Sequence, residues 1–175
     1  IFYYDTTQVI NAIEYSNLVN KNPYLINKDE HWTYAPYTLQ GLINCTLDLM
    51  NIRNFNIKNL GKLREVFLRA QKMARIANCL STWQKEIYEN DFTSTVFAYA
   101  IESNLINVEN LLNKKNIIDK IKKSKIKSEL LWEWQKTHNE ISSLCRKNPP
   151  INYSKFLRQL EKLSVLYLIN GELTK

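Results

Sequence analysis

Three oxygen-bearing side chains recur every four residues near the middle of the chain: Asn78, Thr82 and Glu86. A helix turns by about 100° per residue, so this spacing places all three on one face over consecutive turns. Helical side chains lean toward the N-terminus, which lets Glu86 reach back toward Thr82 and Asn78. Hard cations such as Mg²⁺ prefer oxygen ligands. The spacing therefore predicts a Mg²⁺ site on this face.

Two basic residues share the same helical face. In helical projection Arg75 lies about 60° and Lys85 about 20° from Asn78. Cationic side chains beside a metal can hold an anionic leaving group. The opposite side of the segment is apolar and carries Ile76, Leu80, Trp83 and Ile87. The alternative interpretation is the ordinary polar face of an amphipathic helix.

The segment 75–86 resembles the second metal motif of class I terpene synthases, which is called the NSE/DTE motif. In that family an Asn or Asp, a Ser or Thr four residues later, and a Glu after four more bind one Mg²⁺. A basic residue commonly precedes the Glu, as Lys85 does here. The flanking residues 69–78 and 89–100 also resemble bacterial members, and the likeness is best over 60–102.

The resemblance implies an all-α barrel around an apolar pocket, in which Mg²⁺ and basic residues hold the diphosphate of a prenyl substrate. Ionisation releases diphosphate and leaves an allylic cation. On this basis Asn78, Thr82 and Glu86 bind metal, and Lys85 and Arg75 contact diphosphate. Aromatic walls stabilise a carbocation through cation–π contacts, although each such ring is also an ordinary core residue. The candidates for these walls are Trp32, Tyr34, Tyr37, Phe97 and Tyr99.

The chain departs from the family pattern at several positions. Cys79 stands where many members carry Asp after the Asn. The Asp-rich first metal motif is missing, because Asp29 is followed only by Glu30 and His31, and Asp5 and Asp48 stand alone. Two further features of the family are also missing. His31-Trp32 lies roughly where the upstream diphosphate-sensing Arg is expected, and Leu166-Tyr167 stands in place of the C-terminal Arg-Tyr pair.

These departures allow two interpretations of residues 1–175, both within a single all-α domain. The chain is the C-terminal part of a larger terpene synthase-like lyase, which agrees with its start at Ile1. Otherwise it is a split or degenerate relative, whose Asp-rich motif comes from a second copy or a complementary chain. In both cases we expect the isolated chain to be inactive. The alternative function is a non-catalytic helical interaction module.

Composition favours helices and argues against several other classes of protein. The 175 residues are 45% hydrophobic and include only three Gly and four Pro, fewer turn residues than an all-β fold needs. No run of 18 apolar residues and no signal peptide occurs, so we expect no membrane span and a cytoplasmic protein. The three cysteines form no CxxC pair and the two histidines form no HExxH motif, which argues against a zinc site.

The net charge of +7 is concentrated in a basic run. A solvated helix face is the ordinary interpretation, and a surface for nucleic acid or an anionic membrane is the alternative. No aromatic residue interleaves with these lysines, so we expect no nucleic-acid partner. The run consists of Lys114, Lys115, Lys120, Lys122, Lys123, Lys125 and Lys127.

Apolar spacing of three and four residues predicts six or seven helices. The longest is expected at about 60–89 and ends at Asn90-Asp91, with N-cap residues over 91–94 for a short helix that continues to about 104. Another is expected at about 152–169, closed by Gly171. The other predicted segments are a helix at about 6–20, an apolar helical segment over 32–50 with Pro36 near its start, a loop at 51–56, a turn at 108–112 and a helix at about 117–145.

Overall fold

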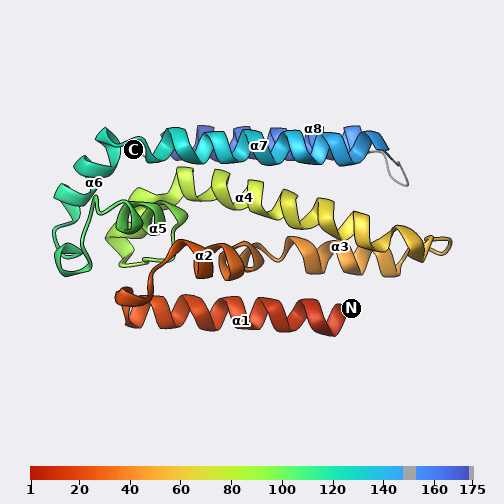
Figure 1. Ribbon diagram of the computed structural model, residues 1–175, viewed down its shortest axis with the longest axis horizontal. Coiled ribbons are helices and arrows are strands. Elements are labelled where there is room, and N and C mark those ends of the chain that lie inside the picture. Colours follow the sequence, from red (N-terminus) through yellow and green to blue (C-terminus); the bar gives the residue numbers. More distant parts are fainter. Residues whose placement is uncertain (148–152, 174–175) are drawn as a thin grey trace.

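The longest helix, α4 (Leu60–Glu89), runs through the centre of the molecule (Figure 1). The structure is a computed structural model that describes residues 1–147 and 153–173, with side chains described over 1–145 and 155–167. Figure 1 shows α4 between an upper layer and two lower layers of helices. It packs against most of the other elements, so its position determines where the polar face predicted from the sequence lies.

The remaining helices wrap around α4. The upper layer is formed by α7 (Ile126–Lys147) and α8 (Tyr153–Leu173), and α1 (Phe2–Lys21) forms the bottom layer (Figure 1). Between α4 and α1 lie α2 (Lys28–Tyr34) and α3 (Gly41–Met50). One end of the molecule is closed by α5 (Thr95–Glu102) and α6 (Lys114–Lys123). Short 3₁₀ turns occur at Pro23–Leu25, Ala35–Leu39, Ile57–Asn59 and Val108–Asn110.

The all-α prediction is confirmed over the described residues, which contain no strand. None of the helices in this part of the chain is long and apolar enough to cross a bilayer. The apolar core has two main clusters along α4. One joins the C-terminal half of α4 to α5, α6 and α7 around Phe97 and Leu130, and the other joins its N-terminal half to α7 and α8 around Leu63 and Ile141.

Three predicted boundaries are wrong. The expected helix over 117–145 is broken at Ser124, where the backbone becomes extended and the Ser124 hydroxyl accepts the Ile126 N–H at 3.2 Å. The 32–50 segment is broken at Gln40, which has a left-handed φ of 56°. The expected end at Gly171 is also wrong, because α8 continues to Leu173; a helix tolerates an internal Gly at a cost of about 1 kcal/mol. These breaks raise the helix count to eight in the described residues, rather than six or seven.

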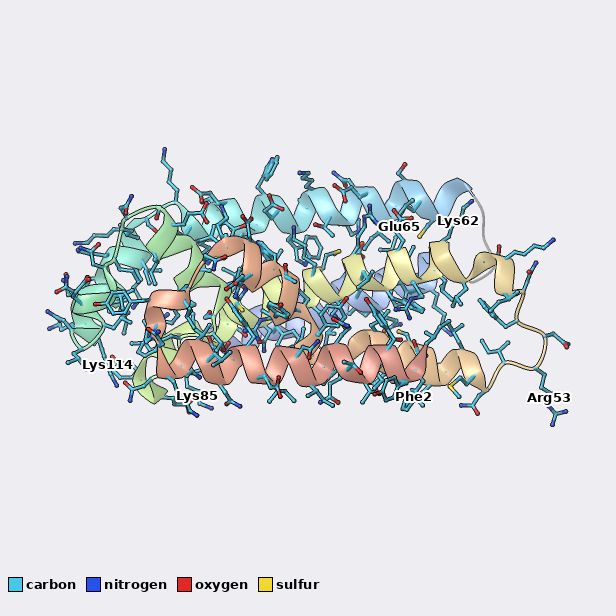
Figure 2. All side chains as sticks on the ribbon, turned by 60° about the horizontal axis from the view of Figure 1, so that its bottom comes forward. Phe2, Arg53, Lys62, Glu65, Lys85 and Lys114 are labelled. Carbon is cyan, nitrogen blue, oxygen red and sulfur yellow. The ribbon has the colours of Figure 1, made fainter. Side chains whose placement is uncertain are left out.

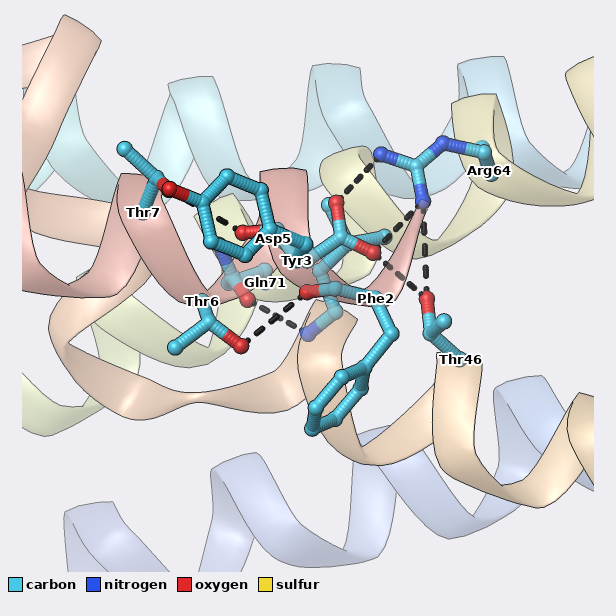
Figure 3. Close-up of polar contacts among 9 residues, drawn as sticks. Phe2, Tyr3, Asp5, Thr6, Thr7, Thr46, Arg64 and Gln71 are labelled. Carbon is cyan, nitrogen blue, oxygen red and sulfur yellow. Dashed lines mark hydrogen bonds and ion pairs between the residues drawn. The ribbon is translucent and has the colours of Figure 1, made fainter.

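A buried ion pair fixes α1 to α4 and α3 (Figure 3). Asp5 is only 1% exposed and accepts two hydrogen bonds from the Arg64 guanidinium, at 2.6 and 2.8 Å. The Thr46 hydroxyl donates a third at 2.6 Å. Burial raises the pKa of Asp5, but the hydrogen bonds and charge of Arg64, together with Thr46, outweigh it and lower that pKa below 3.8. This aspartate is therefore occupied in a structural contact.

Candidate functional site

The polar face predicted from the sequence lies on the C-terminal half of α4, where Asn78, Thr82 and Glu86 follow one another over three turns. All three side chains are half-buried. The connection between α4 and α5, residues 90–94, folds back over this face. The Asp91 N–H donates to the Glu86 carbonyl at 2.9 Å, and Asn90 adopts a left-handed φ of 57° that ends the helix.

Arg75 links α4 to this connection. It is buried, and its Nη2 donates to the Thr93 carbonyl at 2.8 Å. Its Nη1 reaches the Asn78 Oδ1 at 3.4 Å. The guanidinium therefore lies beside the first predicted metal ligand, on the side toward α5.

Thr82 and Glu86 form the closest contact on the face, with 2.6 Å between Thr82 Oγ1 and Glu86 Oε1. Thr82 Oγ1 also lies 2.9 Å from the Asn78 carbonyl. A hydroxyl has one proton, so Thr82 can donate fully to only one of these acceptors at a time. Burial raises the pKa of Glu86, while Thr82, Arg75 and Ser94 act in the opposite direction. A protonated Glu86 would donate to Thr82 and satisfy both contacts.

Three buried polar atoms around this face have no hydrogen-bond partner among the described residues: Arg75 Nε, Glu86 Oε2 and Ser94 Oγ. The charge of Arg75 and a hydrogen-bonding interaction with Ser94 both lower the pKa of Glu86, so the three groups lie near one another and the Ser94 hydroxyl faces the Glu86 carboxyl group. A buried polar group without a partner costs about 1–3 kcal/mol. Arg75 Nε thus remains available for a polar ligand, while the Ser94 hydroxyl and Glu86 Oε2 are placed to meet either each other or a ligand. The sequence predicts Ser94 only as a candidate N-cap of the short helix that follows, and not as a site residue.

Lys85, the other predicted diphosphate contact, points away from this cluster. Its side chain is 75% exposed and its Nζ lies 3.5 Å from Glu89 on the next turn. Exposed pairs of this kind contribute little to stability. Lys85 is therefore free to change rotamer at small cost, but it contacts neither Glu86 nor Asn78 in this structure.

A second buried network lies next to the face and connects α2, α4 and α5. His31 Nε2 lies 2.8 Å from Thr95 Oγ1, and Cys79 Sγ lies 3.2 Å from the same hydroxyl. Burial, and then the charge of Arg75, lower the pKa of His31 from 6.5 to about 3, so the imidazole is neutral at physiological pH. Thus His31 and Cys79 contact the same Thr95 hydroxyl.

The five aromatic residues predicted as pocket walls do not surround the Asn78–Glu86 face as a group. Tyr34 stacks on Tyr15 with ring centroids 4.9 Å apart, and Phe97 is fully buried in the core. Burial raises the pKa of Tyr37, whose environment includes Asp5 and Arg64.

The other two rings, Trp32 and Tyr99, meet edge to face with centroids 6.5 Å apart. Lys72 lies over the Trp32 ring at 4.6 Å, and Lys28 lies over the Tyr99 ring at 4.2 Å. One face of each ring is therefore already in contact with a cation.

A groove of about 510 Å³ lies elsewhere on α4, between α7 and α8. Its floor includes Ala77 and Leu80, which lie on the apolar side of α4 rather than on the predicted metal face. Trp134 and Val165 add apolar walls, and at its edge His138 Nε2 donates to the Glu161 carboxylate at 2.7 Å. The groove and the polar face are thus separate features of α4.

The other acidic residues do not form a second metal site in the described part of the chain. No group of three or more His, Cys, Asp or Glu side chains there is placed to hold a metal ion. Asp5 pairs with Arg64, and Asp29 and Asp48 are exposed. Besides Glu86, the face has the Asp91 carboxylate close enough to raise the pKa of Glu86, but Asp91 Oδ1 already accepts the Thr93 N–H and hydroxyl.

Comparison with known proteins gives no match: no family model fits the chain, and no curated protein and no solved structure matches it. The case for a function therefore depends on the residues and geometry of the chain itself.

Proposed function

We propose that this chain carries the second metal motif of a Mg²⁺-dependent terpene synthase-like lyase, which ionises a prenyl diphosphate and releases diphosphate. The observation that carries the proposal is the buried Glu86 Oε2, which has no partner among the described residues and lies on one helical face with Thr82 and Asn78. A buried carboxylate oxygen without a partner is costly unless a cation or donor meets it.

The donor set suits Mg²⁺. Asn78 supplies an amide oxygen, Thr82 a hydroxyl and Glu86 a carboxylate, and Mg²⁺ commonly combines one or two carboxylates with water and phosphate oxygens. When bound, Mg²⁺ neutralises the charge that develops on a departing diphosphate. Glu86 with Asp91 nearby does not make up a group of three metal-ligating side chains in the described residues, so a complete metal cluster would need the Asp-rich motif from residues outside this chain.

The basic residues would bind and orient the diphosphate. The Thr93 carbonyl holds Arg75 in place, which leaves Arg75 Nε as a fixed donor. Ser94 Oγ, at the N-terminus of α5 and beside Glu86, would be a second donor. Lys85 would add its charge by leaving Glu89, which costs little because the pair is exposed.

The alternative is a non-catalytic helical interaction module, and the outer face of α1 favours it. Ile10, Ile13 and Leu18 are each about half exposed on this bottom helix (Figure 1). An apolar face of this kind is typical of a surface that packs against another chain or domain. A terpene synthase-like chain that lacks part of its barrel would show the same feature, so the two functions must be separated by ligand binding.

Calorimetric titration with inorganic diphosphate tests the proposal. We expect the 175-residue chain to bind diphosphate when Mg²⁺ is present and weakly when it is absent. Glu86→Gln should weaken Mg²⁺-dependent binding by at least about tenfold, because it removes a metal ligand. Glu65→Gln is the matched control, since Glu65 lies on the same helix but pairs with Arg69, which has no proposed role in binding. Equal affinities for the wild type and Glu86→Gln would contradict the metal assignment and favour the interaction module.

A further inference from the structure

One end of the molecule carries most of its net positive charge. Residues 114–127, here called the lysine end, contain seven lysines and one aspartate, whereas the whole chain has a net charge of +7. They form α6 and the start of α7, at the left of Figure 1. Figure 2 places Lys114 at this end and Arg53 and Lys62 at the opposite end of the long axis.

The fold directs these lysines outward. On α6 the apolar residues Ile117, Ile118 and Ile121 are buried in the core cluster that contains Leu130. Six of the seven lysines are exposed, and no ion pair joins any of the seven to a described carboxylate. The six are Lys115, Lys120, Lys122, Lys123, Lys125 and Lys127. Clustered like charges repel one another, so an anionic surface that neutralises them is favoured.

Two apolar side chains lie exposed at the same end. Leu112 is 90% exposed and lies two residues before α6. Tyr88 is 63% exposed, and its carbonyl accepts a hydrogen bond from Lys114 Nζ at 3.0 Å. Apolar side chains among lysines are typical of surfaces that lie on a membrane, where lysines meet anionic headgroups and apolar groups enter the interface.

We propose that the lysine end binds the surface of an anionic lipid bilayer, with Leu112 inserted at the headgroup level. Nucleic acid fits this surface less well. Residues 114–127 contain no arginine for bidentate contacts to phosphates or bases. The inference is independent of the metal site, because it uses residues beyond α4 and α5.

Co-sedimentation with lipid vesicles tests this inference. We expect the chain to bind phosphatidylcholine vesicles that contain one third phosphatidylserine, and not vesicles of phosphatidylcholine alone. Binding should be strong in low salt and lost in molar salt, which screens exposed charges. Each lysine near such a surface strengthens binding by about fivefold, so the double variant K122E/K123E should bind more than about tenfold more weakly.

Two further variants make the test specific. The double variant K58E/K62E changes the charge equally at the opposite end, where both lysines are exposed, and should bind phosphatidylserine vesicles much more strongly than K122E/K123E. Leu112→Ser should weaken binding several-fold without unfolding the chain, because Leu112 is almost fully exposed. Equal losses in the two double variants, or no binding to phosphatidylserine, would overturn the proposal. The proposal would also be overturned if the chain bound an RNA oligonucleotide more tightly than phosphatidylserine vesicles and Leu112→Ser left the RNA binding unchanged.

Discussion

At the scale of single residues, Glu86 is a largely buried carboxyl group that the fold satisfies only in part. Its Oε1 contacts Thr82 at 2.6 Å, whereas its buried Oε2 has no partner in the described part of the chain. Burial raises its pKa above 4.5, even though Thr82, Arg75 and Ser94 favour the charged form. Folding therefore makes the charged form of Glu86 harder to reach than in the unfolded chain, and a bound cation would favour the carboxylate.

This raised pKa has a consequence for stability. A carboxyl group with a raised pKa in the folded state stabilises the fold below its unfolded pKa, near 4.5, and this contribution is lost as the pH rises through the folded pKa. At pH 7 without Mg²⁺, the neutral variant Glu86→Gln should therefore melt above the wild type. A gain of about 1 kcal/mol corresponds to roughly 2–4 °C in a chain of this size.

Differential scanning fluorimetry at pH 7 and pH 4 measures this effect. The difference between Glu86→Gln and the wild type should shrink at pH 4, where the wild-type glutamate is mostly protonated. Glu89→Gln, at an exposed position on the same helix, should show no such gain at pH 7. A lower melting temperature for Glu86→Gln at pH 7 would mean that the ionised carboxylate is already well stabilised without a cation.

At the scale of elements, α4 acts as the common support of two polar networks that fix its neighbours. At its N-terminal half the Asp5–Arg64–Thr46 contact joins α1 and α3 to it (Figure 3). At its C-terminal half the Thr95 hydroxyl joins α2 and α5 to it through His31 and Cys79. The second network fixes the start of α5, and with it Ser94, against the predicted metal face.

The first network provides a test of how α1 is held. Asp5→Asn should reduce the free energy of unfolding by about 3 kcal/mol, because it leaves the Arg64 guanidinium without its buried counter-charge. Urea denaturation at pH 7 measures the loss, and Asp48→Asn is the control, since Asp48 is exposed on α3. The pKa of Asp5 is lowered below 3.8, so its contribution is present above that pH and lost as the pH falls through the lowered value. Equal stabilities of the two variants would show that the ion pair contributes nothing net.

At the scale of the whole molecule, the all-α class and the central helix could be predicted from sequence, whereas the tertiary contacts could not. The bounds of α4 follow from a long run of helix-forming residues that stops at Asn90, a residue that tolerates the left-handed conformation. The sequence does not reveal the break at Ser124, because apolar residues keep helical spacing on each side of it, from Ile117 to Ile121 and from Ile126 to Leu130, and no Gly or Pro lies between.

In the candidate site, too, the local arrangement could be predicted from sequence and the tertiary contacts could not. Helical periodicity alone places Asn78, Thr82 and Glu86 on one face, and the structure agrees. The cover over that face could not be predicted, because it depends on Arg75 meeting the Thr93 carbonyl 18 residues later in the chain. The position of His31 depends on Thr95, 64 residues away, and no local pattern encodes such a contact.

The two proposed sites, the metal face and the lysine end, lie close together on the molecule. The proposed metal face lies on the C-terminal half of α4, and the lysine end lies beyond it at the same end of the long axis, where Figure 2 shows both Lys85 and Lys114. A chain bound to an anionic membrane through the lysine end would therefore hold its metal face near the lipid surface. An amphiphilic prenyl diphosphate would be concentrated at that surface.

Anomalous diffraction from crystals grown with Mn²⁺ and inorganic diphosphate tests the metal assignment most directly. Mn²⁺ shares the preference of Mg²⁺ for oxygen ligands and gives an anomalous signal. We predict a Mn²⁺ peak coordinated by side-chain oxygens of Asn78, Thr82 and Glu86, with diphosphate beside it and in contact with Arg75. The assignment would be contradicted if a well-occupied Mn²⁺–diphosphate complex bound elsewhere on the chain. In that case no Mn²⁺ peak would lie beside Thr82 and Glu86, and their mutual contact would be unchanged.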